Sequence, residues 1–199
     1  MNPAEIIIKK AEYAKVRRSI RSGDLLSFNP RCVWYKPWSY ITWLIALTNK
    51  YHICHSAMAC WWEGNLLCVQ MTSSKDRIVL LSEYVRLWPG KIIVSRPIHM
   101  GSCNIHKAIH TMVSITERPY GWIRLILLGW SNTLSGGLLW PNPIDKDDNN
   151  SPIPPVCSEA YSRAMRLSGF DAVIERPDSR TEPHHLFESK KMKPLFRLV

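Results

Sequence analysis

Cys157 is placed where a thiol can become reactive, because it follows a proline-rich stretch and opens a helical pattern. Residues 154–161 read PPVCSEAY. The backbone N–H groups and the dipole at a helix start favour the thiolate and lower the thiol pKa. His55 lies about a hundred residues upstream in a β-patterned run. A thiol and an imidazole brought together can act as a cysteine nucleophile with a histidine base.

A third polar group, Gln70, lies in an apolar run on the strand that follows the His55 run. A Gly-Asn dipeptide at 64–65 separates the two runs as a hairpin turn, so position 55 is expected to face position 70 or 71. A buried Gln needs a hydrogen-bond partner, and its amide oxygen can accept the Nδ1–H of His55. We therefore predict a site in which Cys157 is the nucleophile, His55 the general base and Gln70 the residue that orients His55.

Periodicity predicts the elements that must position these residues. Helices are expected over 2–21, 38–50, 102–117, 119–132 and 157–168, the last closed by Gly169. Strands are expected over 25–28, 53–62, 66–72, 78–81 and 91–96, and the chain after Gly169 reads as mostly extended and irregular. Residues 141–155 read as a polar loop whose acidic cluster lacks the alternation of a calcium site, so no metal site is predicted.

Five short motifs in one order resemble those of the NlpC/P60 cysteine peptidases. Residues 23–28 (GDLLSF) resemble the family's first strand, residues 54–58 (CHSAM) the strand with its base, and residues 69–71 (VQM) the strand with its third residue. Residues 157–159 (CSE) resemble the nucleophile helix, and residues 181–186 (TEPHHL) resemble the element that follows it in YiiX-type proteins. The cysteine helix comes last here. This order is similar to the circularly permuted branch of the papain-like fold, which includes relatives of lecithin:retinol acyltransferase.

The resemblance implies a permuted papain-like fold and acyl transfer to a thiol. Cys157 would attack a carbonyl carbon as a thiolate, and His55 would take and return the proton. The backbone N–H of Cys157 would contribute to an oxyanion hole. No metal and no organic cofactor is needed for this chemistry. The family's third residue is usually His or Glu, whereas Gln70 can orient an imidazole without stabilising an imidazolium by charge.

Composition bounds the partners and the location. The chain has 199 residues, 46% of them apolar, and a net charge of +10 with basic residues concentrated near both ends. This charge suits an anionic cell-wall polymer or a membrane surface, whereas no zinc-finger, RNP or P-loop pattern favours nucleic acid. No secretory signal and no membrane-spanning run is recognised, so a protein cytoplasmic as synthesised is expected, with export by another route or virion association left open. The six cysteines have no metal-like spacing and read better as buried free thiols than as disulfides.

These observations predict one α+β domain over 1–199, with an antiparallel sheet packed against helices. It would comprise an N-terminal helix at 1–21, a core at 22–187 and a basic tail at 188–199. The predicted function is a cysteine hydrolase, a peptidase or amidase, that takes a peptide or acyl substrate, with cell-wall peptides as the leading class. A lipid acyltransferase or thioesterase that meets a membrane through the Trp/Leu-rich segment 119–130 is one alternative. The other alternative is a catalytically inactive binding or structural protein, because Gln70 replaces the family's usual third residue.

Overall fold

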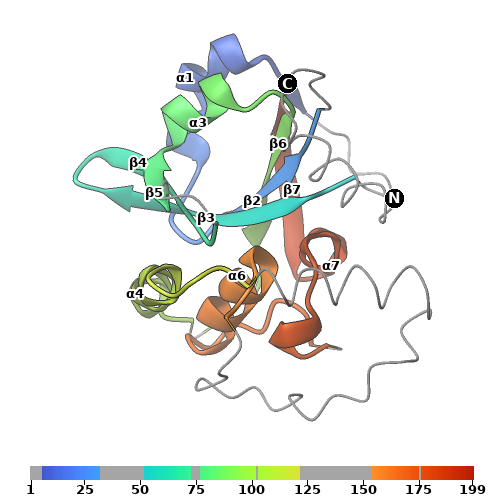
Figure 1. The fold of residues 1–199 in the computed structure, drawn as a ribbon. Coiled ribbons are helices and arrows are strands. Elements are labelled where there is room, and N and C mark those ends of the chain that lie inside the picture. Colours follow the sequence, from blue (N-terminus) through green and yellow to red (C-terminus); the bar gives the residue numbers. More distant parts are fainter. Residues whose placement is uncertain (1–5, 32–51, 73–76, 102, 122–153, 175) are drawn as a thin grey trace.

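A seven-stranded sheet forms the centre of the molecule in the computed structural model, which describes residues 6–31, 52–72, 77–101, 103–121, 154–174 and 176–199. The strands follow the order β1-β7-β6-β2-β3-β4-β5 across the sheet (Figure 1). Neighbouring strands are antiparallel except β1 and β7, which run parallel. The strands are β1 (Ile7–Ile8), β2 (Leu25–Asn29), β3 (His55–Trp62), β4 (Asn65–Gln70), β5 (Ile78–Leu80), β6 (Lys91–Pro97) and β7 (Met192–Leu198).

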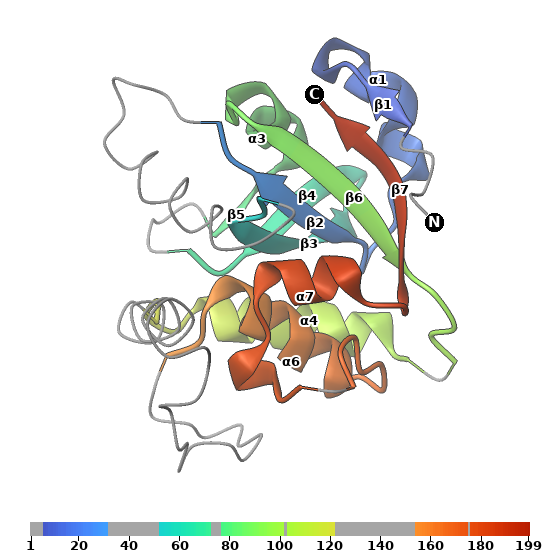
Figure 2. The same ribbon diagram turned by 90° about the vertical axis from the view of Figure 1, so that its right-hand side faces the viewer.

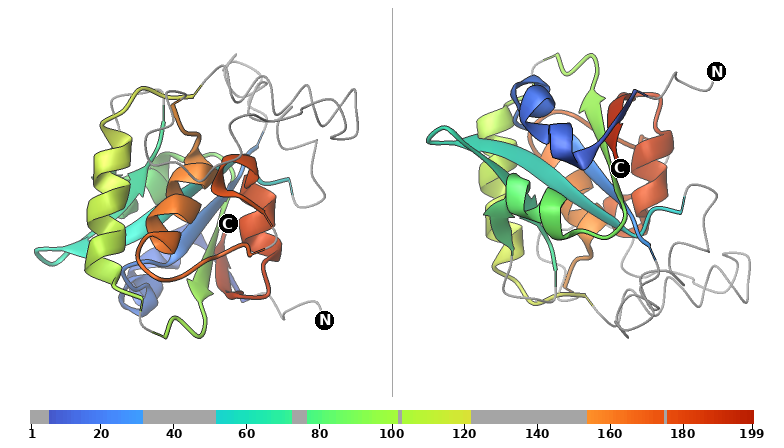
Figure 3. Two further views of the ribbon diagram at one scale, coloured as in Figure 1. Left: turned by 90° about the horizontal axis from the view of Figure 1, so that it is seen from below. Right: turned by 90° about the horizontal axis from the view of Figure 1, so that it is seen from above.

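Helices cover both faces of this sheet. They are η1 (Lys10–Glu12), α1 (Tyr13–Val16), η2 (Arg17–Ser19), α3 (Leu81–Leu87), α4 (Ile105–Thr116), α6 (Cys157–Arg166), η3 (Asp178–Arg180) and α7 (Pro183–Glu188). Helices α4, α6 and α7 lie side by side on one face, and α1 and α3 lie on the other (Figures 1 and 3). The described part of the chain is therefore a mixed α+β structure with helical layers on both sides of a sheet, as the sequence predicts.

Two apolar clusters fill the spaces between these layers, because side chains alternate between the faces of a strand. Leu25 and Met58 belong to the cluster under α6, together with Ala160 and Met165 of the helix itself. Their neighbours in sequence belong to the cluster on the opposite face, with side chains from β2, β3, β6, β7 and α3: Leu26, Phe28, Ala57, Val85, Ile92, Val94 and Phe196.

The predicted strands and two of the predicted helices are confirmed, with boundaries that differ by a few residues. Helix α4 corresponds to the prediction over 102–117, and α6 to the prediction over 157–168. Gly169 follows α6 with a φ of +98°, the left-handed conformation that glycine adopts readily after a helix. The predicted helix over 38–50, the polar loop over 141–155 apart from its last two residues, and most of the predicted helix over 119–132 lie outside the described residues.

The two ends of the chain differ from the prediction. The single helix expected over 2–21 is wrong, because β1 begins at Ile7 and is followed by three short helical turns between Lys10 and Ser19. The β-branched Ile7 and Ile8 pair with β7, and this long-range contact overrides helix propensity. The basic tail expected over 188–199 contains β7, whose Pro194 lies at a register shift between β6 and β7, where a missing N–H is tolerated.

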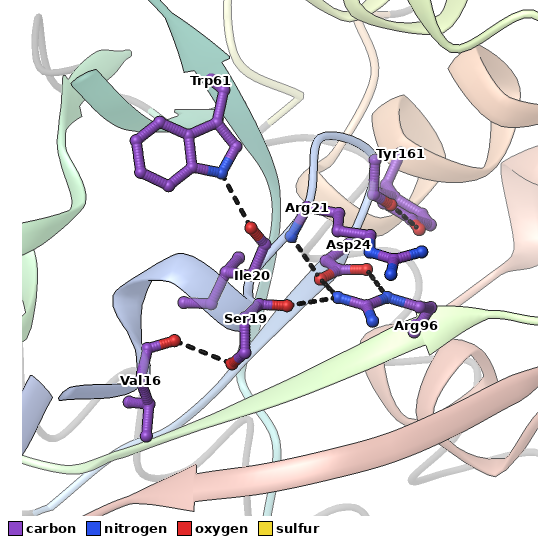
Figure 4. A network of polar contacts seen from close by, with 9 residues as sticks. Val16, Ser19, Ile20, Arg21, Asp24, Trp61, Arg96 and Tyr161 are labelled. Carbon is purple, nitrogen blue, oxygen red and sulfur yellow. Dashed lines mark hydrogen bonds and ion pairs between the residues drawn. The ribbon is translucent and has the colours of Figure 1, made fainter. Parts of the chain in front are cut away.

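A polar network joins the start of β2 to β6 and to helix α6 (Figure 4). The buried carboxylate of Asp24 accepts two hydrogen bonds from the guanidinium of Arg96, at 2.9 and 2.7 Å, and one from the backbone N–H of Arg21 at 2.8 Å. Next to it, the fully buried Tyr161 of α6 donates its hydroxyl to the backbone oxygen of Gly23 at 2.9 Å. The Tyr161 hydrogen bond attaches α6 to the residues just before β2. The Asp24 hydrogen bonds attach the same residues to β6.

Tyr161→Phe is expected to lower the free energy of unfolding by about 1–2 kcal/mol, because it leaves the buried carbonyl of Gly23 without its hydroxyl donor. Urea denaturation measures this change. Ser19→Ala is a matched control, since it also removes one hydroxyl that donates to a backbone oxygen, but at an exposed position. We expect that control to change stability by less than about 0.5 kcal/mol. Equal effects of the two substitutions would contradict a role for Tyr161 in holding α6.

Candidate active site

Helix α6 presents Cys157 at its first position. Val156, in extended conformation with φ −99° and ψ 173°, is the N-cap, and the first intrahelical bond runs from the N–H of Ala160 to the oxygen of Val156 at 3.0 Å. The N–H groups of the first turn therefore precede the helical ladder and point toward the helix start. Cys157 is only 3% exposed. The predicted position of the Cys157 thiol at a helix N-terminus is therefore confirmed.

His55 and Gln70 are brought together at the start of β3. The Nε2 atom of His55 lies 2.8 Å from Oε1 of Gln70. The oxygen can only accept, so Nε2 holds the proton. This corrects the expectation that Gln70 would bind Nδ1–H, and it leaves Nδ1 as the ring nitrogen available to Cys157. The predicted register is also wrong, because Gln70 pairs with Ala57 and reaches His55 as a diagonal neighbour.

The sulfur of Cys157 lies among several hydrogen-bond donors. The side chain of His55 and the backbone N–H groups of Ser56 and Ser158 hydrogen-bond to it. Burial alone would raise the pKa of the thiol. The positive charge of His55 and the three hydrogen bonds outweigh that effect, so the pKa of Cys157 is lowered.

The pKa of His55 moves in the opposite direction. Burial would lower it, but the negative charge of the Cys157 thiolate, the hydrogen bond to that sulfur and the hydrogen bond to Gln70 together raise it. A lowered thiol pKa beside a raised imidazole pKa favours a thiolate–imidazolium pair over the neutral pair. This arrangement combines a nucleophile with a group that can deliver and accept a proton.

Tyr120 is a site residue that the sequence reasoning missed. Its hydroxyl hydrogen-bonds to the sulfur of Cys157, and burial together with the thiolate charge raises the pKa of the phenol. The next residue fixes its position, since the N–H of Gly121 donates to the oxygen of Pro155 at 3.0 Å. A Cβ on Gly121 would lie 2.3 Å from the oxygen of Pro154. In the sequence, only Gly121 could have indicated that the backbone beside Tyr120 approaches another segment closely.

Cys54 is a second buried thiol close to this site. Its Sγ donates to the oxygen of Phe28 at 3.4 Å, and burial, with the charge of Cys157, raises its pKa. A raised pKa keeps this thiol protonated, in contrast to Cys157. The prediction of free thiols is confirmed for the described cysteines: Cys54, Cys60, Cys68, Cys103 and Cys157.

Asp178 fixes the far side of α6. Its carboxylate accepts from the hydroxyl of Ser162 at 2.6 Å and from Nε of Arg166 at 2.7 Å. Within the helix, Arg163 donates to the buried Glu159 at 2.9 Å. These bonds satisfy charged and polar groups on a helix that is almost entirely buried, and so they hold Cys157 in position.

The described residues also bear on metals and membranes. Their His, Cys, Asp and Glu side chains form no group of three that could hold a metal ion. Helices in the same parts of the chain are too short or too polar to cross a bilayer. The segment 119–130, which the lipid alternative would place against a membrane, lies largely outside the described residues.

Comparison with known proteins identifies a similar fold. No protein-family model and no curated protein matches the sequence. A crystal structure described as the metalloprotein yiiX from Escherichia coli O157:H7 is similar, with a TM-score of 0.53 and 12% sequence identity. The match covers 88% of this chain and 96% of that chain. The YiiX-type architecture expected from the motifs is therefore confirmed at the level of the fold, while membership of the NlpC/P60 family stays a prediction.

Gln70→Leu is expected to shift the pH profile of Cys157 alkylation to higher pH. Without the amide oxygen, the pKa of His55 falls and that of Cys157 rises, because the imidazolium form loses a hydrogen bond of about 1 kcal/mol. Iodoacetamide labelling at pH 7 should slow about fivefold. Gln70→Glu is the matched control, since its carboxylate still accepts the Nε2–H and should prevent the loss. A Leu variant with the wild-type profile would show that Gln70 does not orient His55.

Tyr120→Phe is expected to raise the pKa of Cys157, and so to slow its alkylation at neutral pH, because the thiolate loses one hydroxyl donor. The same labelling experiment, followed as a function of pH, measures this shift. Tyr13→Phe is a suitable control, because Tyr13 belongs to the cluster on the opposite face of the sheet. If both variants keep the wild-type profile, the contact between Tyr120 and the sulfur has no effect on the thiol.

Proposed function

We propose that this protein is a cysteine hydrolase in which Cys157 is the nucleophile and His55 the general base. The observation that supports this most directly is the position of the buried Cys157 sulfur at the start of α6, where the side chain of His55 and the backbone N–H groups of Ser56 and Ser158 hydrogen-bond to it. Burial in a protein core normally raises a thiol pKa, as it does for Cys54. The groups around Cys157 work against that effect. The similarity of the fold to a YiiX structure is consistent with the proposal.

The chemistry follows from the atoms around the sulfur. The Cys157 thiolate attacks a carbonyl carbon, a C–S bond forms, and negative charge develops on the carbonyl oxygen. The backbone N–H of Cys157, ahead of the helical ladder, is a suitable donor to that oxygen. The His55 imidazolium gives its proton to the leaving amine as the amide bond breaks. His55 then takes a proton from water, which attacks the thioester and releases the acid.

Gln70 is proposed to act through His55 rather than on the substrate. Its hydrogen bond fixes the proton on Nε2 and so directs the other ring nitrogen to the thiol. An amide has no negative charge to stabilise the imidazolium, so we expect a modest rate. The substrate class that we propose is an amide bond in a peptide, with cell-wall peptides first. The net charge of +10 would favour an anionic polymer around such a substrate.

The test combines thiol labelling with hydrolysis. Iodoacetamide should label Cys157 rapidly well below pH 8, as followed by site-resolved mass spectrometry, and His55→Ala should lose this labelling. On a peptide substrate found by screening, His55→Ala should lower kcat/KM by about 10²–10⁴-fold. His106→Ala is the matched control, since His106 is exposed on α4. Slow labelling with an ordinary thiol profile in both wild type and His55→Ala would sink the proposal and favour an inactive binding protein.

A further inference from the structure

A cavity of about 350 Å³ lies where α7 passes into β7. Figure 2 shows α7 ending beside the start of β7. Its lining comes from the segment 172–174, from Arg176 and His185, and from residues 188–191. A volume of this size is typical of sites for small organic ligands. None of the residues proposed for the cysteine chemistry lines this cavity.

Positive charge dominates the lining. Among the described residues, the charged side chains that line the cavity are those of Arg176, Glu188, Lys190 and Lys191. The ammonium of Lys191 donates to the backbone oxygen of Asp171 at 2.9 Å, which holds it in place without neutralising it. Among the described residues, no salt bridge joins the three cations or Glu188 to an oppositely charged side chain. The described part of the lining therefore carries three positive charges and one negative charge.

His185 adds a fixed neutral donor. Its Nδ1 accepts the backbone N–H of Glu182 at 3.1 Å, so in the neutral ring the proton lies on Nε2. Burial, followed by the charges of His184 and Arg176, lowers the pKa of His185 to about 3. The His184 ring lies 4.0 Å from it, between ring centroids, and also approaches Glu182, at 3.5 Å. His185 is thus an uncharged N–H donor at neutral pH, surrounded by a positive field.

One part of the lining is apolar. It consists of Ala172, Val173 and Ile174, and Ile174 is 68% exposed. We propose that this cavity binds a phosphate monoester, with its oxygens held by Arg176, Lys190 and Lys191 and its organic group against the 172–174 wall. Arginine and lysine are the residues that bind phosphate oxygens most strongly. This site is independent of the proposed hydrolase function.

The experiment measures binding of inorganic phosphate and of phenyl phosphate by NMR of the His185 C2–H, assigned with His185→Gln. At pH 7.5, where phosphate is largely the dianion, bound phosphate should shift the His185 C2–H resonance, because the ring lines the cavity. Phenyl phosphate should bind more tightly than inorganic phosphate. Arg176→Ala should weaken phenyl phosphate binding by about tenfold or more. Lys193→Ala removes the same charge from an exposed residue of β7 outside the lining, and should change affinity less than about twofold.

Three results would overturn this inference. The first is an unchanged His185 C2–H resonance at pH 7.5 and millimolar phosphate. The second is an equal loss of affinity in Arg176→Ala and Lys193→Ala, which would indicate diffuse attraction to a basic surface. The third is equal affinity for the two probes, which would remove the role of the apolar wall. Cys157→Ser should bind phenyl phosphate as the wild type does, so a failure of the hydrolase proposal is distinguishable from a failure of this one.

Discussion

The burial of a polar helix is the constraint on which the site depends. Nine of the ten residues of α6 are buried, including Glu159, Ser162 and Arg163. A buried charge without a partner costs several kcal/mol, and Glu159 and Arg163 pair with each other. The hydroxyls of Ser162 and Tyr161 donate to Asp178 and to the Gly23 carbonyl. A helix held by so many directional bonds has one favourable position against the sheet.

The strands under α6 allow this close approach because they carry small side chains there. Ser27 of β2 and Ser56 of β3 are opposite each other in the ladder and are fully buried. By strand alternation they share a face with Leu25 and Met58, which pack against α6. The backbone of β3 can then come near the first turn of the helix. This explains how the backbone N–H of Ser56, on β3, reaches the sulfur of Cys157.

Local patterns were sufficient to predict part of the molecule and its site. The β3–β4 hairpin and helix α6 follow from alternation, a turn and a proline-rich start, so Cys157, His55 and Gln70 could be brought together from the sequence. The register was displaced because the β3–β4 hairpin is centred between residues 63 and 64, slightly later in the chain than a pairing of 55 with 70 or 71 implies. The expected ring nitrogen of His55 was also wrong, since Nε2 and not Nδ1 lies near Gln70. Tyr120 was missed because only tertiary packing brings it to the sulfur.

The terminal strands show a second limit, because their pairing is remote in sequence. Strand β7 contains a proline and basic residues, which disguise its alternation of buried and exposed positions. Strand β1 has only two residues and depends on β7 as its partner. No local window contains both strands, so residue propensity favoured a helix at one end and a tail at the other.

The parallel pairing of β1 with β7 has a consequence for the order of folding during synthesis. Strand β1 is the first of the seven strands to be synthesised, but its partner in the sheet, β7, is the last of the seven. Strands β2 to β6 are already complete before β7 is made, and β7 must add to the edge of β6 before β1 can add to β7. The isoleucines of β1 therefore have no strand partner until β7 has been made, and their pairing depends on contact between distant parts of the chain.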